Sequence, residues 1–270
     1  MPKPETIRGL ERGLRVLRVL QDIPIASLHT IHGATRIPKP SLLRVLQTLE
    51  SAGVVTRRLA DGNFRLSAFG GVRRKGDRHD RIAEAAAPVL HRLCEKVKWP
   101  SDLFVPAGNY MDRRETSRRH SPFLLPPSEA DRVGRHVGYL MTAIGRAYLA
   151  WCPEEELQRI LSRLRKQNRP GDFLAHNPAK LKRILEQTRA RGYATRDTSF
   201  VGGSLTASPV DDGMAAIAVP LFDGSRNHGA INILWIRTAF TVEAFAARHL
   251  ADLQQAADEI VNSLKSRTGA

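Results

Sequence analysis

The sequence predicts an α+β fold, with a small N-terminal unit of three helices and a hairpin followed by a larger domain of alternating strands and helices. Residues 8–66 contain three helical patterns and then two strand-like runs, which is the element order of a winged helix-turn-helix. Residues 70–79 combine three glycines with four basic residues, as a hinge would. We therefore expect a winged helix-turn-helix in residues 1–69, a hinge and linker helix in 70–98, and a second domain in 99–270.

The first helix is predicted over residues 8–20, in the segment RGLERGLRVLRVL. Leu10, Leu14 and Leu17 recur there at helical spacing, and the arginines lie mostly elsewhere on the helical wheel. We expect these three leucines to form the buried stripe of an amphipathic helix. Pro24 follows and should end the helix.

Two further helices and a hairpin complete the unit. A short helix over residues 26–33 is expected to stop at its final glycine. The third helix has Pro40 in its first turn and runs to Ser51, with Gly53 closing it. Two strand-like runs follow, and the turn sequence Asp61-Gly62-Asn63 between them predicts a β-hairpin wing.

The larger domain has the pattern of strands flanked by helices. Helix starts are marked by N-cap residues and by acidic residues in the first turn, where the helix dipole favours negative charge. Mixed strands and flanking helices indicate an antiparallel sheet. The predicted strands cover residues 103–105, 193–196, 214–222 and 230–236, and the predicted helices cover 80–97, 142–151, the segment from 153, 178–191 and 241–265.

Positive charge is concentrated near the N-terminus. The chain has 42 Lys and Arg against 27 Asp and Glu, a formal net charge of +15. Residues 1–75 hold 14 of the basic and 5 of the acidic residues. A concentrated basic segment favours a polyanionic partner, because phosphate contacts release counterions. A basic surface that serves only solubility explains the charge equally well, so the pattern of the segment has to decide.

The third helix has one apolar and one polar side on a helical wheel. The apolar side consists of Leu42, Val45, Leu46 and Leu49. The polar side consists of Ser41, Arg44, Gln47 and Thr48, whose groups suit base edges in a major groove. A surface helix with a solvated polar side is the alternative, but the element order and the basic wing favour double-stranded DNA. The candidate DNA-binding residues are Arg36, Lys39, Pro40, Ser41, Arg44, Gln47, Thr48, Arg57, Arg58, Asn63 and Arg65.

Residues 25–66, with LHTIHGATRIPKPSLLRVLQTLESAGVV, resemble the N-terminal domain of the IclR family of bacterial regulators. The segment RGLERGLRVLRVL resembles the first helix of that family. RETSRRHSPF, MTAIGRAYLAWCP and RGYATRD resemble a branch of regulators of aromatic-acid catabolism, such as that of the 3-(3-hydroxyphenyl)propionate pathway. The resemblance implies a GAF-like effector-binding domain, a dimer or dimer of dimers, and a small organic acid as effector.

The resemblance also indicates an effector site, in a cup between the sheet and nearby loops. Thr142 begins a helix, so its hydroxyl and the free N–H groups of the first turn would suit a carboxylate. Asn232 lies in an apolar strand, and its amide needs a partner, either the ligand or the protein itself. Ala216 and Ala218 would leave room for a ring, unless neighbouring side chains fill the space. The candidate effector-binding residues are Met141, Thr142, Ala143, Ser208, Ala216, Ala218, Asn232 and Leu234.

Motifs typical of enzymes do not occur in the sequence. The nine histidines include no HExxH pair, Gly202-Gly203-Ser204 is not part of a GxSxG motif, and no glycine-rich phosphate loop is present. We therefore expect no catalytic residues, no cofactor and no bound metal. Two alternatives stay open: an enzyme acting on a small organic acid with an ancillary nucleic-acid-binding module, and an architectural nucleic-acid binder without a ligand.

Composition also bears on location. The N-terminal residues lack the apolar core of a signal peptide, and no apolar run approaches the ~20 residues that cross a bilayer. The two cysteines, Cys94 and Cys152, have no metal-ligand spacing and suit a reducing compartment. These features predict a cytoplasmic protein with no membrane partner.

Overall fold

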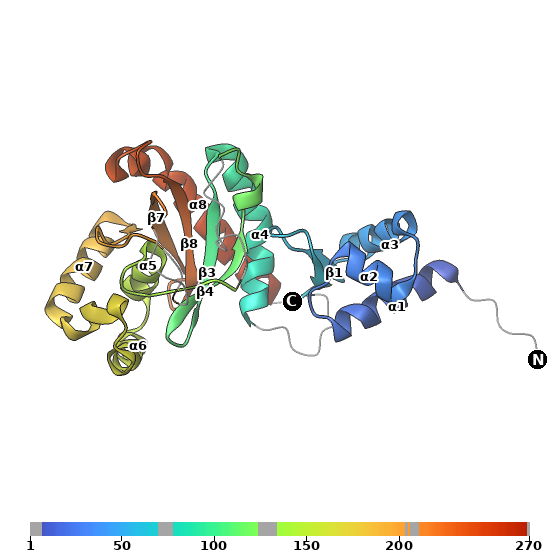
Figure 1. Cartoon of the computed structure of the whole chain (residues 1–270), viewed down its shortest axis with the longest axis horizontal. Helices are drawn as coiled ribbons and strands as arrows, with labels where there is room; N and C mark the ends of the chain where they lie inside the picture. The colour runs from blue at the N-terminus through green and yellow to red at the C-terminus, as the bar shows by residue number, and fades with distance from the viewer. Residues whose placement is uncertain (1–6, 70–77, 124–133, 203–204, 206–210, 269–270) are drawn as a thin grey trace, which may run out of the picture. The chain divides into compact units, whose positions relative to one another are not determined.

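The computed structural model describes residues 7–69, 78–123, 134–202, 205 and 211–268 (Figure 1). Most of the hinge predicted at 70–79 lies outside the described residues. Contacts divide the chain into two compact units, Met1–Glu84 and Ala85–Ala270. Within the described residues, no helix is both long enough and apolar enough to cross a bilayer.

The first unit has three helices followed by an antiparallel hairpin, as the sequence predicts. The helices are α1 (Arg8–Asp22), α2 (Leu28–Thr35) and α3 (Lys39–Ser51), and the hairpin consists of β1 (Val55–Arg57) and β2 (Phe64–Leu66). Each of these five elements contributes a buried apolar residue to one core. The unit therefore has the architecture of a winged helix-turn-helix.

The side of α1 that packs into this core differs from the expected one. Val16 and Leu20 are 0% and 2% exposed, whereas Leu10 and Leu14 are 59% and 47% exposed. The prediction that Leu10 and Leu14 are buried is therefore wrong, although Leu17 packs partly against the core. Apolar residues occupy both sides of this helix, so their spacing alone does not decide which side packs.

The ends of α2 are set by its neighbours in sequence. The Ser27 hydroxyl accepts a hydrogen bond from the Thr30 N–H at 3.1 Å, which caps the first turn. The helix continues through Gly33, so the expected stop at this glycine is wrong. It ends instead at Arg36, whose φ of 57° is left-handed. A glycine inside a helix costs about 1 kcal/mol relative to alanine, a cost small enough for packing and a cap to offset.

The end of α3 agrees with the prediction. Gly53 has a φ of +68°, the left-handed conformation that glycine adopts without strain. The Gly53 N–H donates to the carbonyl of Glu50, and the Val54 N–H donates to the carbonyl of Leu49 at 2.9 Å. These bonds satisfy carbonyls that the helix end would otherwise leave free. The helix therefore stops where the wing has to begin.

The second unit contains a six-stranded antiparallel sheet with strand order β5-β4-β3-β8-β7-β6. Its antiparallel nature and four of its strands were predicted. Two strands were missed, β4 because its sequence is mostly polar and charged, and β5 because two residues are too few to show a pattern. The strands are β3 (Ser101–Ala107), β4 (Tyr110–Thr116), β5 (His136–Val137), β6 (Ala194–Thr195), β7 (Met214–Phe222) and β8 (Asn227–Ile236).

Helices cover both faces of this sheet (Figure 1). α5 packs on the face that carries Ala216 and Leu234, within one apolar cluster. α8 packs on the other face, where the Phe245 ring stacks on Trp235 with centroids 3.7 Å apart. The helical segments are α4 (Arg78–Val97), η1 (Arg118–His120), α5 (Ala143–Trp151), α6 (Glu154–Gln167), η3 (Pro170–His176), α7 (Pro178–Arg191) and α8 (Val242–Thr268).

Candidate nucleic-acid interface and effector site

Helix α3 presents its polar side outward. Leu42 and Leu46 are 0% and 1% exposed and pack in the core of the first unit, while Val45 and Leu49 pack partly against it. Arg44, Gln47 and Thr48 are exposed on the opposite side, and Ser41 is half-buried. The helix orientation predicted from the sequence is therefore confirmed. These outward side chains carry hydrogen-bond donors and acceptors that can pair with the edges of bases in a major groove.

The N-terminus of α3 adds backbone donors to this surface. Pro38 is the N-cap residue, and no capping hydrogen bond from a side chain is formed there among the described residues. The first N–H groups of a helix have no partner within it, and Pro40 has no N–H at all. The N–H groups of Lys39 and Ser41 therefore remain for an anion such as a phosphate. Lys39 and Arg36 are exposed beside them, and each adds a positive charge.

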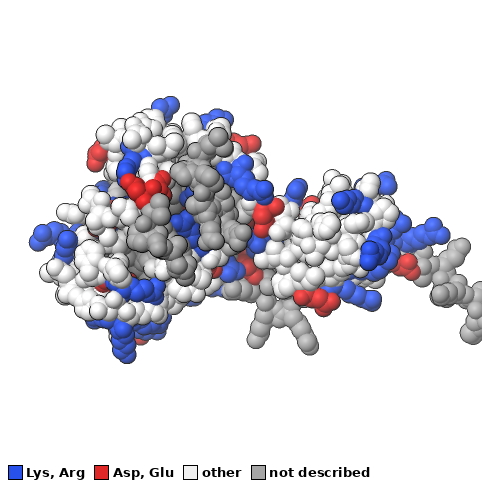
Figure 2. All heavy atoms as spheres, viewed as in Figure 1, with Lys and Arg blue, Asp and Glu red and all other residues white. Residues whose placement is uncertain are grey.

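The wing places Arg57 and Asn63 near its turn. Arg57 is exposed, and its Nε donates to the carbonyl of Gly62 at 3.0 Å. Its guanidinium lies 5.6 Å from the Phe64 ring centroid. The Asn63 side-chain amide donates to Asp61 at 3.1 Å. Blue atoms of Lys and Arg predominate over red atoms of Asp and Glu on the visible face of this unit in Figure 2.

Arg58 and Arg65 do not lie on this surface. They are 7% and 5% exposed, so the structure contradicts their expected role as exposed wing contacts. Arg58 lies 3.5 Å from the carboxylate of Asp61, and Arg65 lies 3.5 Å from that of Asp80 in the first turns of α4. Burial of a guanidinium is costly unless a carboxylate accompanies it, and these ion pairs explain why both arginines fold inward.

The expected effector residues gather on the α5 face of the second unit's sheet. Ala218 pairs with Asn232 and Ala216 with Leu234 across β7 and β8. Asn232 is 4% exposed, and the other members belong to the apolar cluster under α5. Residues 141–143, at the start of α5, are buried beside them. Ser208 lies outside the described residues.

The polar groups expected to hold a ligand already have partners in the protein. The Thr142 hydroxyl accepts from the Gly145 N–H at 3.0 Å and donates to the Gly138 carbonyl at 2.7 Å. The Asn232 Oδ1 accepts from the Asp102 N–H at 2.8 Å. Of the two partners considered for Asn232, the ligand or the protein, its side-chain oxygen therefore has the protein. The Thr142 hydroxyl and the Asn232 Oδ1 therefore do not require a ligand to complete their hydrogen bonds.

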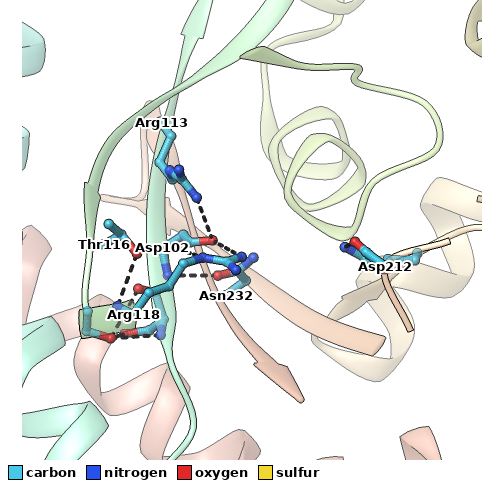
Figure 3. Close-up of polar contacts among 9 residues, drawn as sticks. Asp102, Arg113, Thr116, Arg118, Asp212 and Asn232 are labelled. Carbon is cyan, nitrogen blue, oxygen red and sulfur yellow. Dashed lines mark hydrogen bonds and ion pairs between the residues drawn. The ribbon is translucent and has the colours of Figure 1, made fainter. Parts of the chain in front are cut away.

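A buried charged cluster, missed at the sequence level, adjoins these residues (Figure 3). Arg118 donates to both oxygens of Asp102, at 3.3 and 3.1 Å, and Thr116 donates to Oδ1 at 2.5 Å. Arg113, fully buried, lies 3.7 Å from the same carboxylate. Asp102 is 1% exposed. The signal that could have revealed this cluster is an aspartate directly before the apolar run Leu103 to Ala107 of β3.

The Asp102 carboxylate is ionised in this setting. Burial alone would raise its pKa, but the charges of Arg118 and Arg113, with hydrogen bonds from Arg118 and Thr116, lower the pKa below its usual range. A second pair lies across the site, where Arg196 Nη1 and Nη2 donate to Asp212 at 2.7 and 2.8 Å. The α5 face of the sheet therefore combines an apolar floor with paired charges.

Two family models match the chain. One describes the IclR helix-turn-helix domain and matches residues 9–59, and the other describes the C-terminal domain of bacterial IclR transcriptional regulators and matches residues 77–262. The chain belongs to the IclR family. It is a transcriptional regulator with a DNA-binding helix-turn-helix and a C-terminal effector-binding domain. Membership in this family also argues against the alternative that the chain is an enzyme with an ancillary nucleic-acid-binding module. The family and the relatives described below are transcriptional regulators and not enzymes.

Individual relatives agree with this assignment. The chain is 28% identical to the probable transcriptional regulator SauR of Cupriavidus necator, over 93% of this chain and 95% of that protein. It is 30% identical to the HTH-type transcriptional regulator BhcR of Paracoccus denitrificans, over 80% and 73%. The fold resembles that of Thermotoga maritima IclR, with a TM-score of 0.54, 22% identity, and coverage of 96% and 99%. It also resembles an IclR homolog from Microbacterium hydrocarbonoxydans complexed with 4-hydroxybenzoate, with a TM-score of 0.52, 21% identity, and coverage of 96% and 99%.

Proposed function

We propose that this IclR-family regulator reads an operator with the polar side of α3. The observation that carries the proposal is the orientation of this helix, whose leucines lie in the core while Arg44, Gln47 and Thr48 face outward. Side chains of these kinds form hydrogen bonds with base edges in a major groove. The exposed N-terminus of α3, with Lys39, Pro40 and Ser41, contacts phosphate and so fixes the position of the helix on the duplex.

The surroundings of α3 extend this contact. Arg36 adds charge next to the helix N-terminus, and Arg57 and Asn63 reach the backbone or the minor groove from the wing. Arg58 and Arg65, each buried beside an aspartate, stabilise the wing and do not contact DNA. Of the three wing arginines, only Arg57 is therefore proposed to bind DNA.

We further propose that the protein acts as a dimer or a dimer of dimers. Two helix-turn-helix units would then engage two half-sites of one operator. Three exposed apolar residues, Ile7 directly before α1 and Leu10 and Leu14 within it, support self-association, because the described part of the first unit leaves them uncovered. In this scheme residues 1–69 bind DNA, 70–98 connect the units, and 99–270 bind the effector.

The effector is proposed to be a small organic acid, with an aromatic acid as the first candidate. The 4-hydroxybenzoate bound to the Microbacterium hydrocarbonoxydans homolog supports this choice. Ala216 and Ala218 are 3% and 0% exposed within the apolar cluster under α5, so binding of a ring beside them, Leu234 and Asn232 requires this packing to open. Residues 141–143 at the start of α5, and Ser208, complete the expected set. The effector acts by binding one conformation of the regulator more tightly than another.

Selection of duplexes from a random pool tests the DNA-binding proposal. The wild-type chain should enrich one sequence motif. A variant with Arg44→Ala, Gln47→Ala and Thr48→Ala should still bind duplexes at low salt but enrich no motif, because phosphate contacts remain while base contacts are lost. Enrichment of the same motif by the variant would show that another surface reads the sequence.

Titration with acids tests the effector proposal. The selected duplex, bound to the wild-type chain at constant ionic strength, is mixed with 4-hydroxybenzoate, benzoate or 3-(3-hydroxyphenyl)propionate. At least one acid should change the apparent affinity for the duplex, while the matched amides should not. If all acids leave the affinity unchanged, the proposed class of effector is wrong.

A further inference from the structure

Arg135 faces the same side of the sheet as the proposed effector residues. Met111 pairs with Val137 across β4 and β5, and Arg113 and Arg135 extend this ladder, because the Arg113 N–H donates to the Arg135 carbonyl at 2.9 Å. Opposite residues, and residues two apart on one strand, share a face. Arg135 therefore lies on the face of Met111 and Val137, which belong to the apolar cluster under α5.

The guanidinium of Arg135 has no carboxylate of its own among the described residues. Two carboxylates act on it electrostatically, those of Asp102 and Asp212. Each is already engaged through both oxygens, Asp102 by Arg118 and Asp212 by Arg196. In the described part of the chain, Arg135 forms no ion pair, and its Nε is buried without a hydrogen-bond partner.

The electrostatic environment of Arg135 disfavours its own charge. Burial lowers the pKa of its guanidinium, and the neighbouring charges of Arg118 and Arg196 lower it further against the opposing effect of the two aspartates. An arginine in a protein keeps its proton nonetheless. The result is a partly buried positive charge that an incoming anion would neutralise.

We propose that Arg135 binds the carboxylate of the effector, with Arg118 adding positive potential beside it. This inference rests on the proposed effector-binding function and assigns a residue to it. It moves the acid group from the start of α5, where the Thr142 hydroxyl is already used, to the end of the sheet where β4 meets β5. A planar guanidinium with a free Nε suits a carboxylate, which accepts two parallel hydrogen bonds.

The experiment compares ionised and neutral probes on the full-length chain by calorimetry and thermal unfolding. The probes are benzoate and 4-hydroxybenzoate, with benzamide and 4-hydroxybenzamide as neutral counterparts. The variants are Arg135→Gln and a matched control, Arg183→Gln, which removes an exposed arginine from α7. Arg135→Gln should weaken binding of the acids by about tenfold to a hundredfold, because a hydrogen bond to a charged group is lost. The amides should bind the variant and the wild type equally, and the control should bind all four probes as the wild type does.

Stability without a probe separates binding from a structural role. Arg135→Gln should unfold at the same temperature as the wild type or a higher one, since it removes a partly buried charge that has no carboxylate of its own among the described residues. Equal binding of acids by the variant and the wild type, or no binding of either acid by the wild type, would overturn the proposal. If acids change the DNA affinity of Arg135→Gln as they change that of the wild type, the assignment of Arg135 fails while the proposed function stands. If the wild type binds acids but its DNA affinity never changes, the regulatory function fails instead.

Discussion

Arg44→Ala and Arg65→Ala should separate DNA binding from folding, although sequence alone gives both arginines the same role. Arg44 is exposed on α3, so its loss should change the free energy of unfolding by no more than about 0.5 kcal/mol. At the selected duplex, the same change should cost about 1–3 kcal/mol of binding free energy if Arg44 reads a base. The loss should be much smaller on an unrelated duplex.

Arg65→Ala should have the opposite signature. Arg65 is 5% exposed, and the Asp80 side chain, 3.5 Å away, is 11% exposed, so truncation leaves a mostly buried carboxylate without this cation. Breaking such a pair costs about 3–5 kcal/mol. For a unit of this size, that corresponds to a fall in Tm on the order of 10 °C or more.

Fluorescence anisotropy with the selected duplex measures the binding free energy. Urea unfolding, followed by circular dichroism, measures the free energy of unfolding. Binding has to be measured at a temperature where Arg65→Ala is still folded, so that instability is not mistaken for lost contact. A direct contact of Arg65 with DNA would be shown instead if Arg65→Ala keeps wild-type stability and loses sequence-dependent affinity as Arg44→Ala does.

Four further outcomes follow from the same structure. Lys39→Ala should weaken binding to every duplex alike and reduce the slope of log K against log salt by about 0.9, as titration at several salt concentrations would show. Asp102→Asn should lower the free energy of unfolding by about 3–5 kcal/mol, because two buried guanidiniums lose their shared carboxylate; an unchanged urea midpoint would contradict this. Because the folded-state pKa of Asp102 is lowered, its contribution to stability is present above about pH 4 and is lost on further acidification, so the wild type should lose stability more steeply with acid than Asp102→Asn. Gly145→Ala should lower Tm, because the added Cβ would overlap the backbone of Tyr139 at a cost of about 1–3 kcal/mol or more.

The parts of the fold that local pattern determines were predictable from the sequence. The two sides of α3, its end at Gly53 and the wing turn depend on residues close together in the chain, and each lies where expected. The packing side of α1 was not predictable, because its apolar residues offer two stripes. Only the position of α2 and α3 selects Val16 and Leu20 over Leu10 and Leu14.

Charged residues whose partners are distant in sequence were the main source of error. Arg65 looks like a DNA contact in a basic wing until the fold places Asp80 beside it. β4 reads as a polar loop because its arginines give no apolar signal, yet Arg113 pairs with Asp102 on the neighbouring strand. Arg135 acquires its role only through the register of β5 on β4. Such pairs depend on tertiary contacts that periodicity does not encode.

Cross-linking from α3 to DNA tests the central claim most directly. The photoreactive residue p-benzoylphenylalanine is placed at position 47, on the exposed side of α3, and in a second chain at position 183, on the exposed side of α7. Irradiation in the presence of the selected duplex should cross-link position 47 to bases within the enriched motif and leave position 183 unreacted. Cross-links from position 183 alone, or from position 47 to all duplexes without regard to the motif, would contradict the claim that α3 reads the operator.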